Sequence, residues 1–159
     1  MTELLLTRPI DQAQEFAASV AAALPGRYEP VYWPLIRIER EPAELALDDV
    51  QGLLFTSANG VRAFAQASPR RDIPALCVGD GTATAARAAG LIASSARGDA
   101  GALAQLAVAS HLPGAGAYLH LRGRDTTGDI AGALAVEGIE VREAVLYAAR
   151  PAMDVPEAA

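Results

Sequence analysis

The sequence predicts an α/β protein built on parallel strands, and three observations indicate this class. Short, nearly continuous apolar runs alternate with alanine-rich amphipathic stretches along the chain. The apolar runs end in polar or glycine-containing turns, and Gly or Pro follows the alanine-rich stretches. Runs that are apolar at nearly every position are typical of strands covered on both faces. We therefore expect a doubly wound parallel sheet with helices on both sides.

The same pattern predicts the individual elements. Strands are expected over residues 3–7, 29–33, 51–56, 75–78, 91–94, 117–121 and 140–146. Helices are expected over residues 10–23, 59–67, 81–89, 99–110 and 127–137. Gly26, Gly90 and Gly138 each follow a predicted helix, where glycine commonly terminates helical structure. At helical spacing, the predicted apolar stripe of the first helix contains Ala13, Phe16, Ala17, Val20 and Ala23.

Two segments depart from the alternation. Residues 34–50 contain a short apolar strand, residues 35–39, followed by a charged stretch with Pro42, which indicates a connector between two structural bodies. Residues 154–157, Asp-Val-Pro-Glu, form a helix-start signal with no helix body after it. We expect from this signal that a longer natural protein continues beyond Ala159.

Composition excludes several functions. The chain has 159 residues, a formal net charge of −6 and a pI near 4.8, which disfavours binding to nucleic acid or to an anionic membrane surface. No lysine occurs among the 13 basic residues, so a Schiff-base lysine and a P-loop lysine are excluded. The single cysteine cannot form an internal disulfide. The N-terminus has no signal-peptide pattern and the apolar runs are too short to span a bilayer, so we expect a cytoplasmic location.

Candidate ligand-binding residues lie where predicted strands end and helices begin. Ligands of open parallel sheets bind outside the carboxyl ends of the strands. Helix N-termini at that edge offer backbone N–H groups and partial positive charge, which suit carboxylates or phosphates. The candidates are Arg8, Thr56, Ser57, Ala58, Asn59, Gly81, Thr82, Ala83, Arg122, Gly123 and Tyr147. These residues alone predict an α/β domain with an anion-binding cleft and name no reaction.

Structural roles compete with each of these assignments. Thr56 and Ser57 are also suited to capping the next helix without touching a ligand. Arg122, like Arg124, could pair with Asp125 or Asp129 on the surface. Tyr147 fits equally well as an amphipathic residue at the end of a strand.

Other reactive groups favour structural interpretations. Gly79-Asp80-Gly81 resembles the start of a dinucleotide fingerprint, but Thr84 stands at the third glycine position, which disfavours a dinucleotide site. His120 is expected to be a hydrogen-bonded structural residue inside a strand, and His111 to cap the end of a helix. Cys77 is expected to be a small buried apolar residue. No metal-ligand spacing and no Ser–His–Asp order emerges, so no metal site is expected.

Seven segments, taken in their order, resemble the uroporphyrinogen-III synthase family. They are LLLTRP (4–9), WPLIRIE (33–39), LLFTSANGVRAF (53–64), CVGDGTATAARAAG (77–90), ARGDAGALAQL (96–106), LHLRGRD (119–125) and LAVEGIEVREAVLYAARP (134–151). Each segment is weak alone, whereas their order across nearly the whole chain is specific. The family usually has proline where Ala58 stands.

The resemblance implies two doubly wound, flavodoxin-like domains joined by a two-stranded linker. Residues 1–36 and 148–159 would belong to a first domain that is incomplete in this chain. Residues 39–147 would form the inserted domain. A monomer is implied for the full-length family, and a dimer is possible for the shorter chain.

The resemblance also implies a cofactor-free cyclisation of hydroxymethylbilane to uroporphyrinogen III, through an azafulvene and a spiro intermediate that inverts ring D. Tyr147 would assist departure of the substrate hydroxyl. The substrate carboxylates would lie at the helix N-termini near Thr56, Ser57, Thr82 and Ala83, with Arg8 and Arg122 as further partners. Catalysis would come mainly from positioning the reacting rings. Two alternatives remain: a non-enzymatic module that binds a small anion, and an inactive fragment.

Overall fold

The computed structural model describes residues 1–152, so the helix start predicted at residues 154–157 lies outside the described residues. The chain divides into two compact units. The larger unit comprises residues 40–148, and the smaller one contains residues 1–39 with the segment that begins at Ala149. Among residues 1–152, no helix combines the length and apolar character needed to cross a bilayer.

Strands and helices alternate through the larger unit, as the sequence predicts. In chain order the elements are β4 (Val50–Phe55), α2 (Ala58–Ala67), β5 (Ala75–Cys77), α3 (Asp80–Ala88), β6 (Ala93–Ser95), α4 (Ala100–Ser110), β7 (Ala117–Gly123), α5 (Ile130–Val136) and β8 (Val141–Pro151). Strand β8 begins in this unit and extends beyond it. The α/β class with a mainly parallel sheet is confirmed.

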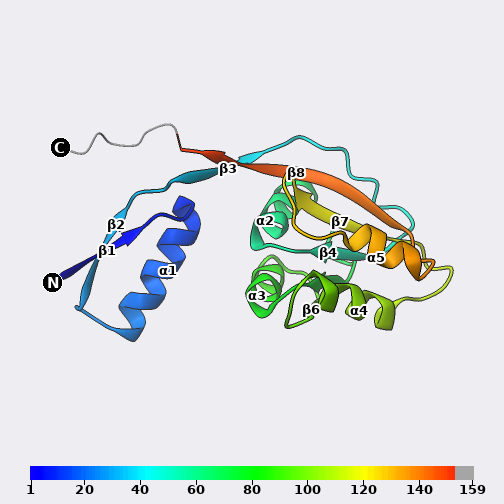
Figure 1. Ribbon diagram of the computed structural model, residues 1–159, viewed down its shortest axis with the longest axis horizontal. Helices are drawn as coiled ribbons and strands as arrows, with labels where there is room; N and C mark the ends of the chain where they lie inside the picture. Colours follow the sequence, from blue (N-terminus) through cyan, green and yellow to red (C-terminus); the bar gives the residue numbers. More distant parts are fainter. Residues whose placement is uncertain (153–159) are drawn as a thin grey trace. The chain divides into compact units, whose positions relative to one another are not determined.

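The sheet has the order β3-β8-β7-β4-β5-β6, where β3 is Ile36–Arg40 (Figure 1). Strand β4 pairs in parallel with β5 and β7, β5 pairs in parallel with β6, and β7 pairs in parallel with β8. Numbered along the chain, strands β4 to β8 have the spatial order 3-2-1-4-5. Flavodoxin has the order 2-1-3-4-5, so the flavodoxin-like description is wrong for the strand order of this sheet. The order found is that of a Rossmann-type sheet.

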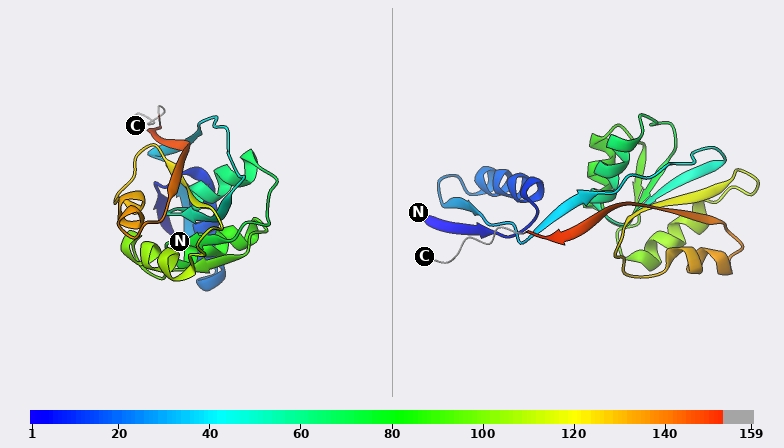
Figure 2. Two further views of the ribbon diagram at one scale, coloured as in Figure 1. Left: turned by 90° about the vertical axis from the view of Figure 1, so that its right-hand side faces the viewer. Right: turned by 90° about the horizontal axis from the view of Figure 1, so that it is seen from above.

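Helices cover both faces of this sheet, with α2 and α3 on one side and α4 and α5 on the other (Figure 2). The face under α2 and α3 buries Leu53, Phe55, Phe64 and Leu121 among others. The opposite face buries a second cluster that includes Leu54, Leu103 and Leu134. Consecutive residues 53, 54 and 55 therefore alternate between two cores, which explains why the strand is apolar at every position.

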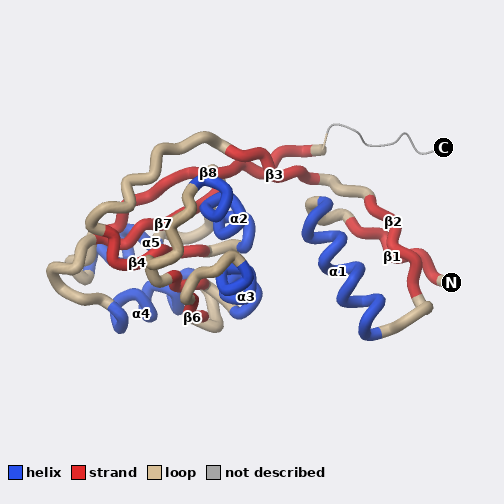
Figure 3. The backbone as a smooth tube through the Cα atoms, turned by 180° about the vertical axis from the view of Figure 1, so that it is seen from behind, coloured by secondary structure: helices blue, strands red, loops and turns tan. Residues whose placement is uncertain are grey.

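The smaller unit is built from β1 (Thr2–Leu6), α1 (Ile10–Ala23) and β2 (Tyr28–Tyr32), with β1 and β2 paired in parallel (Figure 3). Its core consists of Leu6, Ala13 and Ala17. The predicted stripe of α1 is only partly buried, because Phe16 is 38% exposed. Two strands form a narrow surface, which covers Ala13 and Ala17 and leaves Phe16 and Ala23 exposed.

Element boundaries differ from the predictions in two informative places. Helix α5 was expected to start at residue 127 and starts at Ile130, because the Asp129 carboxylate accepts the Gly132 N–H at 2.8 Å and caps the helix there. Strand β8 was expected to end at residue 146 and continues to Pro151. Gly90 and Gly138, with φ angles of 92° and 72°, directly follow the C-cap residues of α3 and α5, so their predicted role at helix ends is confirmed. Gly26 has a φ angle of 71° but lies two residues beyond Leu24, the C-cap of α1, so it does not terminate that helix.

Candidate active site

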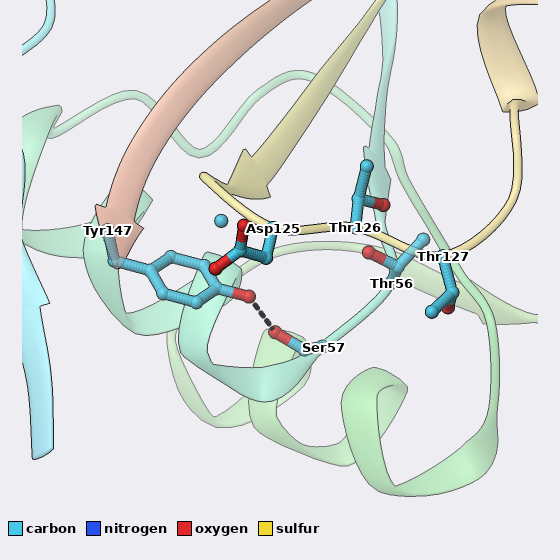
Figure 4. Close-up of a pocket in the computed structure, with 7 residues that line it drawn as sticks. Thr56, Ser57, Asp125, Thr126, Thr127 and Tyr147 are labelled. Carbon is cyan, nitrogen blue, oxygen red and sulfur yellow. Dashed lines mark hydrogen bonds between the residues drawn. The ribbon is translucent and has the colours of Figure 1, made fainter. Parts of the chain in front are cut away.

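A pocket of about 280 Å³ opens at the carboxyl ends of β4 and β7 (Figure 4). Its lining residues are Thr56, Ser57, Gly123, Asp125, Thr126, Thr127 and Tyr147. Strands β4 and β7 are neighbours, but the chain continues from β4 toward β5 on one side and from β7 toward β8 on the other. The pocket therefore lies at the topological switch point, where doubly wound sheets bind their ligands.

Ser57 connects the start of α2 to the pocket. Ser57 is the N-cap residue of α2 and has an extended backbone, with φ −152°. Its Oγ accepts the Gly60 N–H at 3.3 Å. The same Oγ lies 2.6 Å from the Tyr147 hydroxyl (Figure 4). The predicted capping role of Ser57 is confirmed, and the cap simultaneously holds a hydroxyl against the tyrosine.

Tyr147 is placed by the pairing of β7 with β8. Gly123 and Tyr147 are partners in this pairing, after an irregularity between Arg122 and Gly123. A Cβ atom on Gly123 would lie 2.7 Å from the Tyr147 ring, so only glycine allows the ring to lie so close to β7. The Arg124 N–H also donates to the Tyr147 carbonyl at 2.8 Å, which fixes the tyrosine backbone.

Asp125 supplies the charge in the pocket. It is the one charged side chain among the residues that line this pocket, and it shares this lining with Tyr147 (Figure 4). The other polar groups are hydroxyls, including those of Thr126 and Thr127. Sequence reasoning treated Asp125 only as a partner for arginine. Its position two residues after the carboxyl end of β7 is the signal that could have placed it in the site.

Arg122 near the end of β7 and Arg124 directly after this strand have partners that the sequence did not predict. Arg122 Nε lies 3.4 Å from Glu143, and Nη1 donates to the carbonyls of Gly123 and Arg124. Arg124 donates two hydrogen bonds to the Glu41 carboxylate, at 2.7 and 2.8 Å. This hydrogen bonding raises the pKa of Arg124. The alternative in which these arginines pair with Asp125 or Asp129 is therefore wrong.

The remaining predicted site residues lie outside the lining of this pocket. Ala58 and Asn59 are half-buried in the first turn of α2. At the start of α3, Gly81 is exposed, whereas Thr82 and Ala83 are buried. Arg8 belongs to the smaller unit, where its guanidinium lies 4.7 Å from the Phe16 ring centroid.

The structure also locates the histidines and the cysteine. His120 is buried in β7 as expected, but its ring is only partly satisfied: within the described part of the chain Nε2 has no hydrogen-bond partner, whereas Nδ1 faces the Glu143 carboxylate. Its Nδ1 lies 3.4 Å from the Glu143 carboxylate. Burial lowers the pKa of His120, and Glu143 acts in the opposite direction.

Cys77 is fully buried, as predicted, and burial raises its pKa to about 11. The backbone N–H of His111 bonds to Val108 at the end of α4, where this histidine is the C-cap residue, as predicted. No group of three or more potential metal ligands occurs within residues 1–152.

The fold and the pocket define a doubly wound α/β protein whose ligand crevice lies at the switch point of its sheet. A family model described as uroporphyrinogen-III synthase HemD matches residues 19–159. The chain belongs to this family. No curated protein matches the sequence.

Solved structures with a similar fold include proteins from two bacteria. The uroporphyrinogen-III synthetase of Helicobacter pylori matches with a TM-score of 0.60 and 20% identity, covering 82% of this chain and 59% of its own. A mutant uroporphyrinogen III synthase from Thermus thermophilus matches with a TM-score of 0.57 and 22% identity, covering 96% of this chain and 64% of its own. The wild-type form of the Thermus enzyme matches with a TM-score of 0.52 and 21% identity, covering 96% of this chain and 63% of its own. The chain thus spans 59% to 64% of the length of these structures.

Proposed function

We propose that this protein is a uroporphyrinogen-III synthase, a cyclising lyase that converts hydroxymethylbilane to uroporphyrinogen III with inversion of ring D. The family match supports the reaction class. The observation that carries the proposal within the site is the 2.6 Å hydrogen bond between Ser57 and Tyr147 in the pocket. A tyrosine with a hydroxyl neighbour at a ligand crevice is suited to assist the loss of a hydroxyl group.

The first step needs a proton for the leaving hydroxyl. Ser57 Oγ accepts the Gly60 N–H, and its own hydroxyl hydrogen can point to the Tyr147 oxygen. The Tyr147 proton is then available to the substrate hydroxyl. The C–O bond breaks, water leaves with the bonding electrons, and the phenolate that forms accepts the Ser57 hydrogen bond. The pyrrole N–H proton then passes to the phenolate, which restores the Tyr147 hydroxyl and leaves the neutral azafulvene.

The charge distribution of the pocket fits this step. Breaking the C–O bond leaves positive charge spread over the methylene carbon and the pyrrole nitrogen. Asp125 lines the same pocket as Tyr147, and a carboxylate there stabilises developing positive charge. The same negative charge disfavours a substrate carboxylate within this pocket.

The substrate carboxylates are therefore proposed to lie at neighbouring helix N-termini. The candidates are the backbone at Thr56, Ala58 and Asn59 and the backbone at Gly81, Thr82 and Ala83, with Arg8 as a further partner. Arg122 is a weaker candidate, because its guanidinium is already bonded to Gly123 and Arg124 carbonyls and lies beside Glu143. After ring A is activated, ring D attacks through its substituted carbon, and the spiro intermediate opens and recloses. Positioning of the two rings supplies most of the catalysis.

The proposed architecture follows the family. Residues 39–147 form an inserted domain, and residues 1–36 with 148–159 belong to the domain from which the chain enters and leaves. The reaction is proposed to need no cofactor and to take place in the cytoplasm, with the protein acting as a monomer.

An isomer assay tests the function. Freshly generated hydroxymethylbilane is supplied to this chain and, separately, to the protein expressed from the whole reading frame of its gene. The type I and type III products are then separated after oxidation. Type I arises by spontaneous closure, so an excess of type III supports the proposal. Binding of hydroxymethylbilane with type I alone in both arms would indicate a binding module and overturn the enzymatic proposal.

Variants at Tyr147 and Ser57 test the site. Tyr147→Phe is expected to lower kcat by roughly 10²- to 10⁴-fold with little change in KM, because it removes the proton donor alone. Ser57→Ala is expected to lower kcat less and to reduce helix stability by about 1 kcal/mol through loss of the cap. Ser57→Thr keeps a capping hydroxyl and is the matched control. Unchanged kcat in Tyr147→Phe would remove the acid role.

A further inference from the structure

A bidentate ion pair crosses strand β8 at the position of Tyr147. Glu41 follows β3, and Arg124 follows β7, which are the two neighbours of β8 in the sheet. Their side chains meet with two hydrogen bonds of 2.7 and 2.8 Å between the guanidinium and the carboxylate. The Glu41 side chain is 19% exposed, so its carboxylate is held in a partly buried position.

The backbones of the same two residues hold β8 from both sides. The Glu41 N–H donates to the Leu146 carbonyl at 2.8 Å, and the Arg124 N–H donates to the Tyr147 carbonyl at 2.8 Å. The ion pair and these two hydrogen bonds therefore form a closed connection around the Leu146–Tyr147 segment. Arg124 also begins the loop that contributes Asp125, Thr126 and Thr127 to the pocket.

We propose that the Glu41–Arg124 ion pair is a positioning clasp that holds loop residues 124–127 and Tyr147 in register across the pocket. The inference deepens the proposed synthase function and rests on it for its catalytic consequence. Glu41 and Arg124 do not line the pocket, so they act through the loop and through Tyr147.

Glu41 also determines which carboxylate Arg124 binds. Asp125 follows Arg124 directly, and its charge also acts on the guanidinium. With Glu41 in place, both arms of the guanidinium fork are bonded to Glu41. Without that carboxylate, Arg124 would be free to bond to Asp125 and draw its carboxylate out of the pocket. The clasp therefore keeps the Asp125 carboxylate available to the substrate.

A second ion pair offers a matched control. Arg70 and Asp72 form the same bidentate geometry, with two hydrogen bonds of 2.8 Å, and neither residue lines the pocket. Both arginines are solvent-accessible, whereas the Glu41 carboxylate is more buried than that of Asp72. Exposed pairs contribute little to stability, so Asp72→Asn should change the denaturation midpoint little, and the midpoint of Glu41→Gln is measured beside it so that any loss of stability is separated from the effect on the site.

The test compares Glu41→Gln with Asp72→Asn in the full chain. Glu41→Gln is expected to lower kcat by about tenfold to a hundredfold with KM close to wild type, because misplacement of reacting groups acts on the chemical step. Asp72→Asn should leave both constants unchanged. The exchanged pair Glu41→Arg with Arg124→Glu should recover part of the lost kcat, and Arg124→Lys should lose activity because a single ammonium cannot form the fork.

Hydrogen exchange separates this inference from the proposed function. Amides of residues 123–127 and 147 are expected to exchange faster in Glu41→Gln than in wild type, and Asp72→Asn should leave them unchanged. This result supports the clasp even if the wild-type protein forms no type III product, which would overturn the proposed function alone. Unchanged exchange at these residues, or an activity loss that merely follows global unfolding, overturns the clasp.

Discussion

The ring of Tyr147 packs against a glycine, and this contact makes a single methyl group a test of the site. In Gly123→Ala the new Cβ would lie 2.7 Å from ring carbon Cε2 and 3.1 Å from the hydroxyl oxygen. The ring has to turn away, which weakens its 2.6 Å bond to Ser57. We expect kcat to fall by about tenfold to a hundredfold, with a stability loss of about 0.5–1.5 kcal/mol from the strained rotamer. Steady-state kinetics and urea unfolding measure the two effects.

A double variant shows whether the glycine acts through the tyrosine hydroxyl. When Gly123→Ala is added to Tyr147→Phe, the hydroxyl is already absent and kcat should fall little further. Independent losses that multiply in the double variant would contradict the proposed route.

We predict that His120 makes the stability of the folded protein sensitive to acid. Burial lowers its folded-state pKa below the unfolded value of about 6.5. The folded state therefore binds the proton less well than the unfolded state, so this contribution to stability is complete above pH 6.5 and is lost as pH falls below it. The urea midpoint should decrease between pH 7 and pH 5, and the decrease should be smaller in His120→Gln. Equal slopes in the two proteins would show that His120 does not control this range.

Glu143 limits the size of that effect. Its carboxylate lies 3.4 Å from His120 and raises the histidine pKa, while Arg122, beside the same carboxylate, lowers it. In the protein that retains His120, the substitution Glu143→Gln should therefore make the urea midpoint fall more steeply as the pH is lowered. Urea midpoints at matched pH values provide the comparison.

At the scale of elements, one arginine joins the ends of two helices. The Arg71 guanidinium donates to the carbonyls of Ala65 and Ser68 at the end of α2 and to Ala89 at the end of α3. Helix ends carry unsatisfied carbonyls and partial negative charge, so a cation stabilises both. Arg71→Met keeps the apolar stem and should reduce the free energy of unfolding by about 2 kcal/mol.

The neighbouring arginine is the control for Arg71. Arg70 bonds to Asp72 on the surface, and its replacement by Met should change the urea midpoint much less. Equal destabilisation by the two substitutions would show that the helix-end carbonyls do not depend on Arg71.

The local sequence pattern predicted which helices and strands exist, whereas the residue at which a helix begins depended on the side chain that caps it. The periodicity predicted α5 but placed its start at residue 127, because TTGD offers several residues able to cap. The structure uses Asp129, and this leaves Thr126 and Thr127 to line the pocket. Because Asp129 caps α5, Thr126 and Thr127 lie in the loop before the helix and belong to the site.

At the scale of the whole molecule, the two units differ in how much core they contain. The smaller unit buries Leu6, Ala13 and Ala17, whereas the larger one buries two clusters on the faces of its sheet. We expect amides of β1 and β2 to exchange faster than those of β4 and β7, because stability against local opening follows buried apolar contacts. Hydrogen exchange resolved by peptide measures this directly. Uniform protection across the chain would contradict the expectation.

The sequence predicted several residues of the candidate site, but it did not predict the complete set of residues that lines the pocket. Thr56, Ser57, Gly123 and Tyr147 were predicted and are brought together in one pocket. Asp125 was missed, and Gly81, Thr82 and Ala83 lie outside that pocket although they follow a strand in the same way. The carboxyl ends of the predicted strands cannot be told apart from the sequence. The sequence gives the order of the strands along the chain, but not which strands are neighbours in the sheet.

The sequence by itself determined the α/β class, the alternation of elements and the glycine-terminated helices, because these depend on local periodicity and backbone preference. Only the tertiary structure decided the strand order, which makes β4 and β7 neighbours and creates the switch point. It also decided the contacts between distant residues, such as Ser57 with Tyr147 and Glu41 with Arg124. Such pairs form through packing and sheet register across long sequence separations, which no local pattern specifies.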